Sequence, residues 1–322
     1  MMPGPTNTRY RKEAAMADQS LEAGAWIIVP TPFSSASGEP VDLDSLGRVI
    51  RFMAELGVAG VTVAGVLGEG AKLTESERDA IVERAVVAGA GLPVCVGSNA
   101  GAPAIVTERL HRARARGAAA TLLSPTSAPG LADQHIFELF ERASAAELPI
   151  VVQDHPESSG VNMGVPLLVR LVNELPVVAG IKEEVRNTGP KISALRDAMT
   201  ECAVPILAGL GAVNGANDLA RGADGFMTGV AVPEILLAML RHRDDPSALA
   251  ALERRYLPLL QLEDRLGLAA RKWIYAARGL LADPALRSPG AAVDDHTVQE
   301  LRAKLEATFP GQDLTRPLEI SV

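Results

Sequence analysis

Residues 149–185 read PIVVQDHPESSGVNMGVPLLVRLVNELPVVAGIKEEV. The apolar runs at 149–153 and 177–181 are continuous rather than alternating, which is typical of parallel strands covered on both faces. Between them, residues 164–174 carry apolar side chains at helical spacing. The stretch predicts one strand–helix–strand unit, and a lysine, Lys182, directly follows the second run.

The same unit recurs along the chain. There are eight short apolar runs, at 25–30, 60–65, 93–97, 118–123, 149–153, 177–181, 204–208 and 224–228. Segments with helical periodicity separate them, at 41–55, 74–90, 102–116, 131–146, 164–174, 190–201 and 212–221. Eight consecutive units predict a closed (β/α)₈ TIM barrel. An open doubly wound sheet is the alternative, because one sequence does not give the order of the strands.

The pattern changes after the eighth run. Strand signals stop, and helical periodicity continues at 234–242, 246–263, 265–281 and 294–308. We therefore expect three parts, which are a flexible N-terminal tail at 1–22, the barrel at 23–233 and a C-terminal helical extension at 234–322.

Composition excludes several classes of function. The 322 residues carry a formal charge of −8, which disfavours a nucleic-acid or anionic-membrane binder, and the one basic run, 109–116, is interpreted as a solvated helix face. The two cysteines are too few for a disulfide scaffold. The first 20 residues lack the apolar centre of a signal peptide, and no unbroken 18-residue apolar span follows. We expect a cytoplasmic protein.

Active sites of (β/α)₈ barrels lie at the carboxyl ends of the strands, so the residues after each apolar run are the candidates. Lys182 is the most informative of them, since the chain has only six lysines against 25 arginines. Desolvation inside a barrel lowers the pKa of a lysine, and the free amine can form a Schiff base with a ketone. The alternative is a structural ion pair of Lys182 with Glu183 or Glu184.

Two glycine-containing loops follow other strands. Gly65, Val66 and Leu67 belong to a loop whose backbone N–H groups can bind a carboxylate, so that this loop and Lys182 together would suit a 2-oxo acid. A plain tight turn is the alternative. GLGAVNG at 209–215 resembles a nucleotide-binding loop, but its third glycine is displaced by one position and the strand before it is the seventh. It fits a phosphate site of the last two loops better than a dinucleotide site.

Three motifs resemble the dihydrodipicolinate synthase and N-acetylneuraminate lyase family of class I aldolases and dehydratases. They are VPTPF at 29–33, GVLGEGAKLTESER at 65–78 and GIKEE at 180–184. The resemblance runs from about Gly24 to Thr308 and implies a barrel with a C-terminal helical domain, commonly assembled as a homo-oligomer (tetramer or dimer). It also implies that Lys182 forms the imine with a small-molecule 2-oxo acid such as pyruvate, and that no metal or other cofactor is needed.

The sequence departs from the usual motifs of that family. Gln153 stands where a proton-shuttling tyrosine is usual, and an amide cannot shuttle protons. Val66 and Leu67 replace a threonine pair, Thr126 and Ser127 replace a tyrosine pair, and Ser158 replaces the arginine that binds a second carboxylate. The chain is more similar to the branch that dehydrates 2-keto-3-deoxy sugar acids, at VVQD (151–154), at Glu184 and Val185, and at GLAARK (267–272).

The groups near Lys182 complete the predicted site. Because an imidazole can act as an acid or a base near neutral pH, His155 is a candidate acid or base, although it could equally be a loop histidine facing solvent. We assign catalysis to Lys182, Gln153 and His155, with Gln153 hydrogen-bonding the substrate. Substrate binding is assigned to Gly65, Val66, Leu67, Ser127, Asp154, Glu184, Gly209 and Met227.

Three functions compete at this point. The first is a Schiff-base lyase, a dehydratase or aldolase, acting on a 2-keto-3-deoxy sugar acid or a related pyruvate-derived substrate. The second is a barrel that has lost turnover and serves as a ligand-binding or regulatory protein, since the usual hydroxyl relay is disrupted. The third is a metal-dependent aldolase with Asp154, His155 and Glu184 as ligands.

Overall fold

The computed structural model describes residues 21–200 and 202–322. The predicted tail at 1–22 lies outside the described residues except for its last two positions. Of these, Leu21 is buried, and its backbone N–H donates to the carbonyl of Ala179 at 3.1 Å. Leu21 therefore packs on the barrel rather than extending from it.

Eight parallel strands form a closed barrel, which confirms the predicted fold and excludes the open sheet. Each strand pairs with its neighbours in chain order, and β1 also pairs with β8 through Trp26 and Met227. The strands are β1 (Ala25–Ile28), β2 (Gly60–Val63), β3 (Val94–Gly97), β4 (Ala120–Leu123), β5 (Ile150–Asp154), β6 (Val178–Glu183), β7 (Ile206–Ala208) and β8 (Gly225–Thr228).

Two hydrophobic clusters hold the barrel together, because alternate strand residues point to opposite faces. A small cluster fills the interior and includes Trp26, Cys95, Leu122, Val151 and Met227. A large cluster lies between the strands and the surrounding helices. Gly60 is required by the interior packing, since an added Cβ would lie 2.4 Å from the Trp26 ring.

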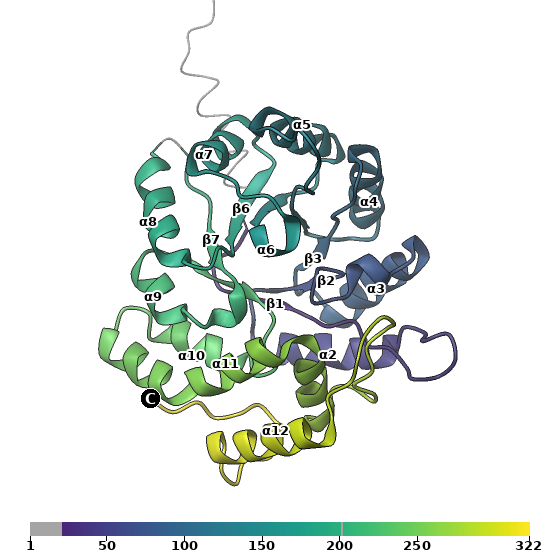
Figure 1. Cartoon of the computed structure of the whole chain (residues 1–322), viewed down its shortest axis with the longest axis vertical. Helices are drawn as coiled ribbons and strands as arrows, with labels where there is room; N and C mark the ends of the chain where they lie inside the picture. Colours follow the sequence, from purple (N-terminus) through teal and green to yellow (C-terminus); the bar gives the residue numbers. More distant parts are fainter. Residues whose placement is uncertain (1–20, 201) are drawn as a thin grey trace, which may run out of the picture.

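A ring of helices surrounds the strands (Figure 1). The main helices are α2 (Leu43–Leu56), α3 (Glu75–Gly89), α4 (Pro103–Ala115), α5 (Asp133–Ala143), α7 (Val165–Glu174), α8 (Thr188–Ala198) and α9 (Gly215–Ala220). Four short elements lie in the connections: η1 (Gly70–Lys72), η2 (Ser144–Ala146), α6 (Pro156–Ser159) and η3 (Leu210–Ala212). The sequence analysis missed η1 and α6, which are too short to show a period.

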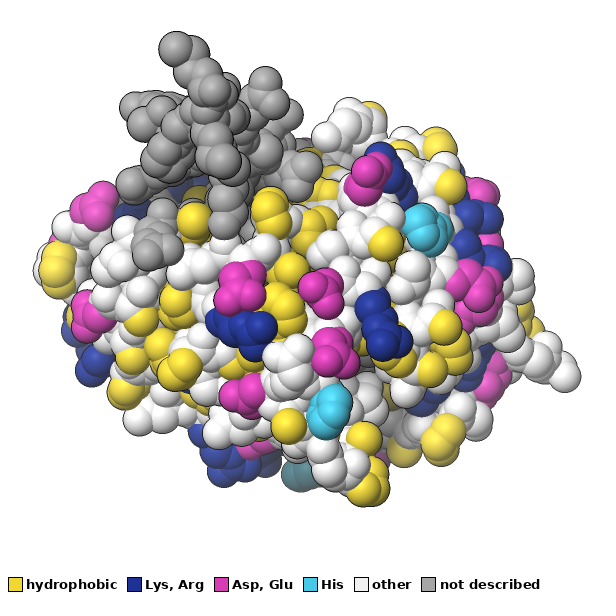
Figure 2. Space-filling view, turned by 90° about the horizontal axis from the view of Figure 1, so that it is seen from above, with side chains coloured by type: hydrophobic (Ala, Val, Ile, Leu, Met, Phe, Trp, Pro, Cys, Tyr) yellow, Lys and Arg dark blue, Asp and Glu magenta, His cyan; other side chains and the backbone are white. Residues whose placement is uncertain are grey.

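The basic run of α4 is partly buried against a neighbouring helix rather than free in solvent. Arg109 pairs with Glu75 at 2.5 Å, and Arg116 pairs with Asp79 at 2.7 Å, both carboxylates lying on α3. Basic and acidic side chains also lie side by side on the face seen in Figure 2. The arginines of this run thus join helices of the barrel.

Three helices follow the barrel and gather on one side of it (Figure 1). They are α10 (Glu234–Arg241), α11 (Pro246–Ala277) and α12 (Asp295–Thr308). Gly267 interrupts α11 with a φ of 71° and a ψ of −153°, a conformation that glycine alone adopts readily. Because α11 contacts η3 and α9, it reaches the carboxyl ends of the strands. Within the described ranges, we find no helix of the length and apolar character that crossing a membrane requires.

Candidate active site

Lys182 points into the barrel near the end of β6. It is in register with Gln153 of β5 and Leu207 of β7, and its side chain is 2% exposed. It lines a cavity of about 180 Å³ at the carboxyl ends of the strands. The amine is thus both poorly hydrated and open to a small ligand.

Glu184 is the direct partner of this amine. Its Oε2 lies 2.6 Å from Nζ of Lys182 and accepts a hydrogen bond of 2.7 Å from Nε2 of Gln153. Burial by itself raises the pKa of Glu184, but the charges of Lys182 and His155 and the hydrogen bonds from Lys182 and Gln153 outweigh it, so the pKa lies below its usual range. The carboxylate is therefore a proton acceptor within reach of the amine.

Gly209 leaves room for Glu184. A Cβ added to Gly209 would lie 2.2 Å from Cγ of Glu184, so a larger residue there would collide with the carboxylate arm. The backbone N–H of the next residue, Leu210, donates to Oε1 of Glu184 at 3.4 Å. Gly209 thus acts on the site through Glu184.

His155 stands at the rim of the same cavity. Its Nδ1 lies 3.7 Å from Oε2 of Glu184 and 2.7 Å from the hydroxyl of Ser158 on α6. Its side chain is 17% exposed, so it faces both the cavity and solvent. Nδ1 is thus within hydrogen-bond distance of Ser158 but beyond it for Glu184.

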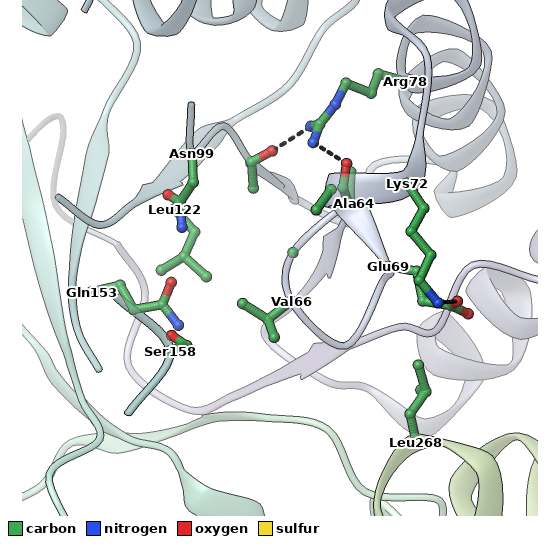
Figure 3. A pocket seen from close by; sticks show the side chains of 14 residues that line it. Ala64, Val66, Glu69, Lys72, Arg78, Asn99, Leu122, Gln153, Ser158 and Leu268 are labelled. Carbon is green, nitrogen blue, oxygen red and sulfur yellow. Dashed lines mark hydrogen bonds and ion pairs between the residues drawn. The ribbon is translucent and has the colours of Figure 1, made fainter. Parts of the chain in front are cut away.

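The loop after β2 adjoins a second, larger cavity of about 440 Å³, shown in Figure 3. Val66, Leu122 and Gln153 line both cavities, so the two are continuous along these side chains. Gly65 lines the larger one and Leu67 the smaller.

Hydrogen bonds from side chains hold the loop in a strained backbone conformation. Ala64 and Glu69, at its two ends, have positive φ angles of 54° and 52°. The hydroxyl of Thr31 donates to the carbonyl of Gly68 at 2.6 Å. Arg78 donates to the carbonyls of Gly70 and Gly97, at 2.5 and 2.8 Å, and so joins the loops after β2 and β3 (Figure 3).

The N–H groups of Val66 and Leu67 are free in this loop. Within the described residues, neither donates a hydrogen bond. Two free N–H groups beside a cavity form a site for a carboxylate. This geometry supports the carboxylate-binding role that the sequence predicts for the loop.

Four predicted substrate-binding residues do not line either cavity, namely Gly209, described above, and Asp154, Met227 and Ser127. Asp154 points away from the barrel interior, where its carboxylate pairs with Lys191 and accepts from the N–H of Met163 at 3.3 Å. Met227 is fully buried in the interior cluster. Ser127 is exposed, and its N–H donates to the carbonyl of Ser159 at 3.0 Å.

The placement of Asp154 also bears on the metal-dependent alternative. Asp154 and Glu184 belong to neighbouring strands, but the first faces the outer helices and the second the cavity, so these two carboxylates and His155 do not converge. Across 21–200 and 202–322, no group of three or more His, Cys, Asp or Glu residues could hold a metal ion.

The glycine loop at 209–215 makes hydrogen bonds within the protein. Gly211, in η3, has a φ of 64°, and its N–H donates to the hydroxyl of Thr228 at 2.8 Å. This bond ties the loop after β7 to the end of β8. It leaves that N–H with a protein partner rather than a phosphate.

The sequence analysis missed three charged residues of the smaller cavity, which are Glu157 of α6 and Asp264 and Arg271 of α11. The two residues of α11 lie close to the break at Gly267, and Arg271 is within the GLAARK motif, to which the sequence assigns no role. The signal was a glycine inside a helical pattern, which often has a packing or functional reason.

Comparison with known proteins decides the family. The model of the dihydrodipicolinate synthetase family matches residues 23–308. The chain belongs to the dihydrodipicolinate synthetase family. It is a Schiff-base lyase of the aldolase and dehydratase class, as the sequence motifs predict.

Three relatives illustrate the range of the family. L-2-keto-3-deoxyarabonate dehydratase of Azospirillum brasilense is 30% identical over 290 residues, which cover 87% of this chain and 92% of the relative. L-threo-3-deoxy-hexylosonate aldolase of Hypocrea jecorina is 31% identical over 58% of this chain and 62% of its own. The crystal structure of dihydrodipicolinate synthase from Rhodopseudomonas palustris superposes with a TM-score of 0.83 at 31% identity, covering 89% of this chain and 97% of that one.

Proposed function

We propose that this protein dehydrates a 2-keto-3-deoxy sugar acid through an imine at Lys182. The observation that carries the proposal is the buried Glu184 carboxylate, which touches the amine of Lys182 and is held there by Gln153. The similarity to a keto-deoxyarabonate dehydratase over most of both chains supports the same reaction.

Substrate binding begins at the loop after β2. The free N–H groups of Val66 and Leu67 bind the substrate carboxylate, and the carbonyl carbon C2 then faces Lys182. Glu184 takes a proton from the ammonium group, and the amine attacks C2. Loss of the carbonyl oxygen as water gives the protonated imine.

Elimination follows at the next two carbons. Glu184, which has returned its proton to the departing carbonyl oxygen, removes a proton from C3, and the electron pair forms the enamine. The enamine expels the C4 hydroxyl, which leaves as water after receiving that proton from Glu184. Hydrolysis of the unsaturated imine consumes one water, so the net change is the loss of one water from the substrate.

The structure favours dehydration over aldol cleavage on one point. Cleavage of the bond between C3 and C4 starts with removal of the proton of the C4 hydroxyl, and Gln153, which replaces the usual tyrosine, cannot take a proton. Elimination starts with removal of a proton from C3, the carbon next to the imine, and Glu184 touches the amine that forms the imine.

Trapping with borohydride tests the imine. Wild-type protein incubated with pyruvate and borohydride should gain a stable adduct on Lys182, which peptide mass spectrometry locates. Lys182→Ala should gain none, while Lys304→Ala, a change on α12 that touches neither cavity, should behave like the wild type. No adduct on the wild type, or the same adduct on Lys182→Ala, would refute the imine.

Product analysis tests the reaction. A panel of 2-keto-3-deoxy pentonates and hexonates should lose water and give no pyruvate. Pyruvate release would indicate an aldolase, and trapping without any product would indicate a ligand-binding protein. Assembly as a homo-oligomer and a cytoplasmic location, which the sequence suggests, stay predictions.

A further inference from the structure

Arg271 is a buried cation without a hydrogen bond. Its side chain is 7% exposed, and it lines the cavity that contains Lys182 and Glu184. None of its N–H groups makes a hydrogen bond within the described part of the chain, and Nε has no accessible surface either. Its nearest carboxylates are those of Glu263 and Asp264, both at 3.6 Å.

Such an arrangement is costly unless something completes it. Buried donors in folded proteins are almost always paired, and a guanidinium has five N–H groups in a fixed planar fork. The two carboxylates beside Arg271 balance its charge but stand beyond hydrogen-bond distance. Nε is enclosed, but the two Nη groups are not, so an acceptor on a molecule in the cavity can reach them.

The position of Arg271 fixes which part of the substrate it meets. A Cβ added to Gly211 would lie 3.3 Å from Nη2 of Arg271, so the guanidinium lies over η3, after β7. The carboxylate-binding loop follows β2, and Lys182 lies on β6, four strands further around the barrel. In the proposed complex the loop holds the substrate carboxylate, C1, and Lys182 holds C2. The remaining carbons of the substrate then lie beside the cavity wall formed by η3 and α11.

The charged groups beside Arg271 determine which substituents on those carbons can bind there. Asp264 faces the guanidinium, and both residues line the cavity. A hydroxyl can donate to Asp264 and accept from Arg271, so it satisfies both groups. A second carboxylate could pair with Arg271 only by lying against Asp264, and like charges at that distance repel.

We propose that Arg271 and Asp264 recognise the hydroxyl-bearing far end of the substrate and select it against 2-oxo acids with a second carboxylate. This inference rests on the proposed function, because it takes Lys182 as the group that holds C2. The two residues, seven positions apart on either side of the break at Gly267, line the same cavity.

The test measures how much of each 2-oxo acid half-saturates borohydride trapping at Lys182. Pyruvate has no far end, a 2-keto-3-deoxy pentonate has hydroxyls there, and 2-oxoglutarate has a carboxylate. Arg271→Lys and Arg271→Gln should raise the half-saturating concentration of the pentonate at least about tenfold and that of pyruvate less than about twofold, as expected for one charged hydrogen-bonding group. Asp264→Asn should lower the value for 2-oxoglutarate. Arg265→Gln is the matched control, since this exposed arginine of α11 pairs with Glu300 at 2.8 Å.

Equal changes for pyruvate and the pentonate, or no change for the pentonate, would overturn the inference. If both Arg271 variants unfold, Asp264→Asn decides, and unchanged selectivity against 2-oxoglutarate then refutes it. Failure of the wild type to trap pyruvate would instead refute the proposed function. In that case calorimetry of the pentonate with wild type and with Arg271→Lys decides the inference, since noncovalent binding should still weaken in the variant.

Discussion

The ammonium nitrogen of Lys272 lies 2.6 Å from Oε1 of Glu69, although 203 positions separate the two residues. Lys272 is fully buried on α11, where it also donates to the carbonyl of Ala285 at 2.8 Å and faces the ring of Phe33 at 4.5 Å. Glu69 ends the loop after β2, and Lys72 pairs with its other oxygen at 2.8 Å (Figure 3). The C-terminal helices thus hold the loop after β2 in place.

Lys272→Met should therefore affect both stability and binding. Removing Lys272 leaves Lys72 as the remaining cationic partner of Glu69, so the buried carboxylate loses one of its two charged hydrogen bonds and the free energy of unfolding should fall by about 1.5–3 kcal/mol. The loop should loosen, so that more pyruvate is needed for trapping at Lys182. Urea unfolding and borohydride trapping measure the two effects.

A double variant separates charge from packing. Adding Glu69→Gln to Lys272→Met removes the carboxylate that has lost one of its two cations and should restore part of the lost stability. Lys304→Met, on α12, is the control for losing a lysine. If the free energy of unfolding falls by less than about 1 kcal/mol in Lys272→Met, the pair of Lys272 and Glu69 does not hold the loop after β2 in place, since exposed ion pairs contribute no more than that.

Glu184→Gln should remove the proton transfers and leave the imine chemistry accessible. General acid–base groups typically contribute about 10²–10⁴-fold to rate, so turnover of a keto-deoxy sugar acid should fall by at least about 100-fold. Trapping of pyruvate should become slower but still occur at Lys182, because the amine remains. Glu174→Gln, on an exposed turn of α7, should leave turnover unchanged. Full turnover in Glu184→Gln would assign the acid and base to another group.

Gly209→Ala tests whether the position of Glu184 matters as well as its charge. The new methyl group would lie 2.2 Å from Cγ of Glu184 and force the carboxylate to move away from Lys182. We expect turnover to fall about as far as in Glu184→Gln, by at least about 100-fold, because proton transfer requires hydrogen-bond distance.

Gly164→Ala is the matched control for this change. Its added Cβ would have only an ordinary contact, at 3.6 Å from Pro166, so stability and turnover should both stay close to wild type. Near-normal turnover in Gly209→Ala would show that Glu184 has room to reorient without losing function.

The period of a strand explains which site residues the sequence could predict. Lys182 and Gln153 share a face because they are in register on neighbouring strands, and Glu184 joins them two positions after Lys182. The same alternation points Asp154 and Glu183 away from the barrel interior. Selecting every residue that follows a strand does not separate inward from outward side chains, which is why Asp154 was predicted to bind substrate.

Tertiary packing explains what the sequence could not predict. Arg271 reaches the cavity only because α11 crosses η3 and breaks at Gly267, and helical periodicity carries no information on that crossing. Met227 lies in the interior like the other inward residues of the strands, but too deep to line either cavity. Depth within a barrel depends on the stagger of the strands, which one sequence does not give.

The outward carboxylates behind the site predict a pH dependence of stability. Glu183 is buried beside Asp154, and Lys191 lies 3.8 Å from Glu183 but contacts Asp154 directly. Burial and the neighbouring Asp154 raise the pKa of Glu183 to about 8. Because the pKa is raised on folding, the contribution of Glu183 to stability is fully present below the unfolded pKa of 4.5 and is lost as pH rises through about 8.

Glu183→Gln should abolish this loss, since the amide resembles the protonated acid and cannot ionise. At about pH 4 the variant and the wild type should have similar free energies of unfolding, and at about pH 9 the variant should be the more stable of the two. Urea unfolding at both pH values measures the difference, and Glu174→Gln should show no such pH-dependent gain. A variant advantage that is constant with pH, or that shrinks as pH rises, would mean that Glu183 stays ionised in the folded protein and that Lys191 is shared by both carboxylates.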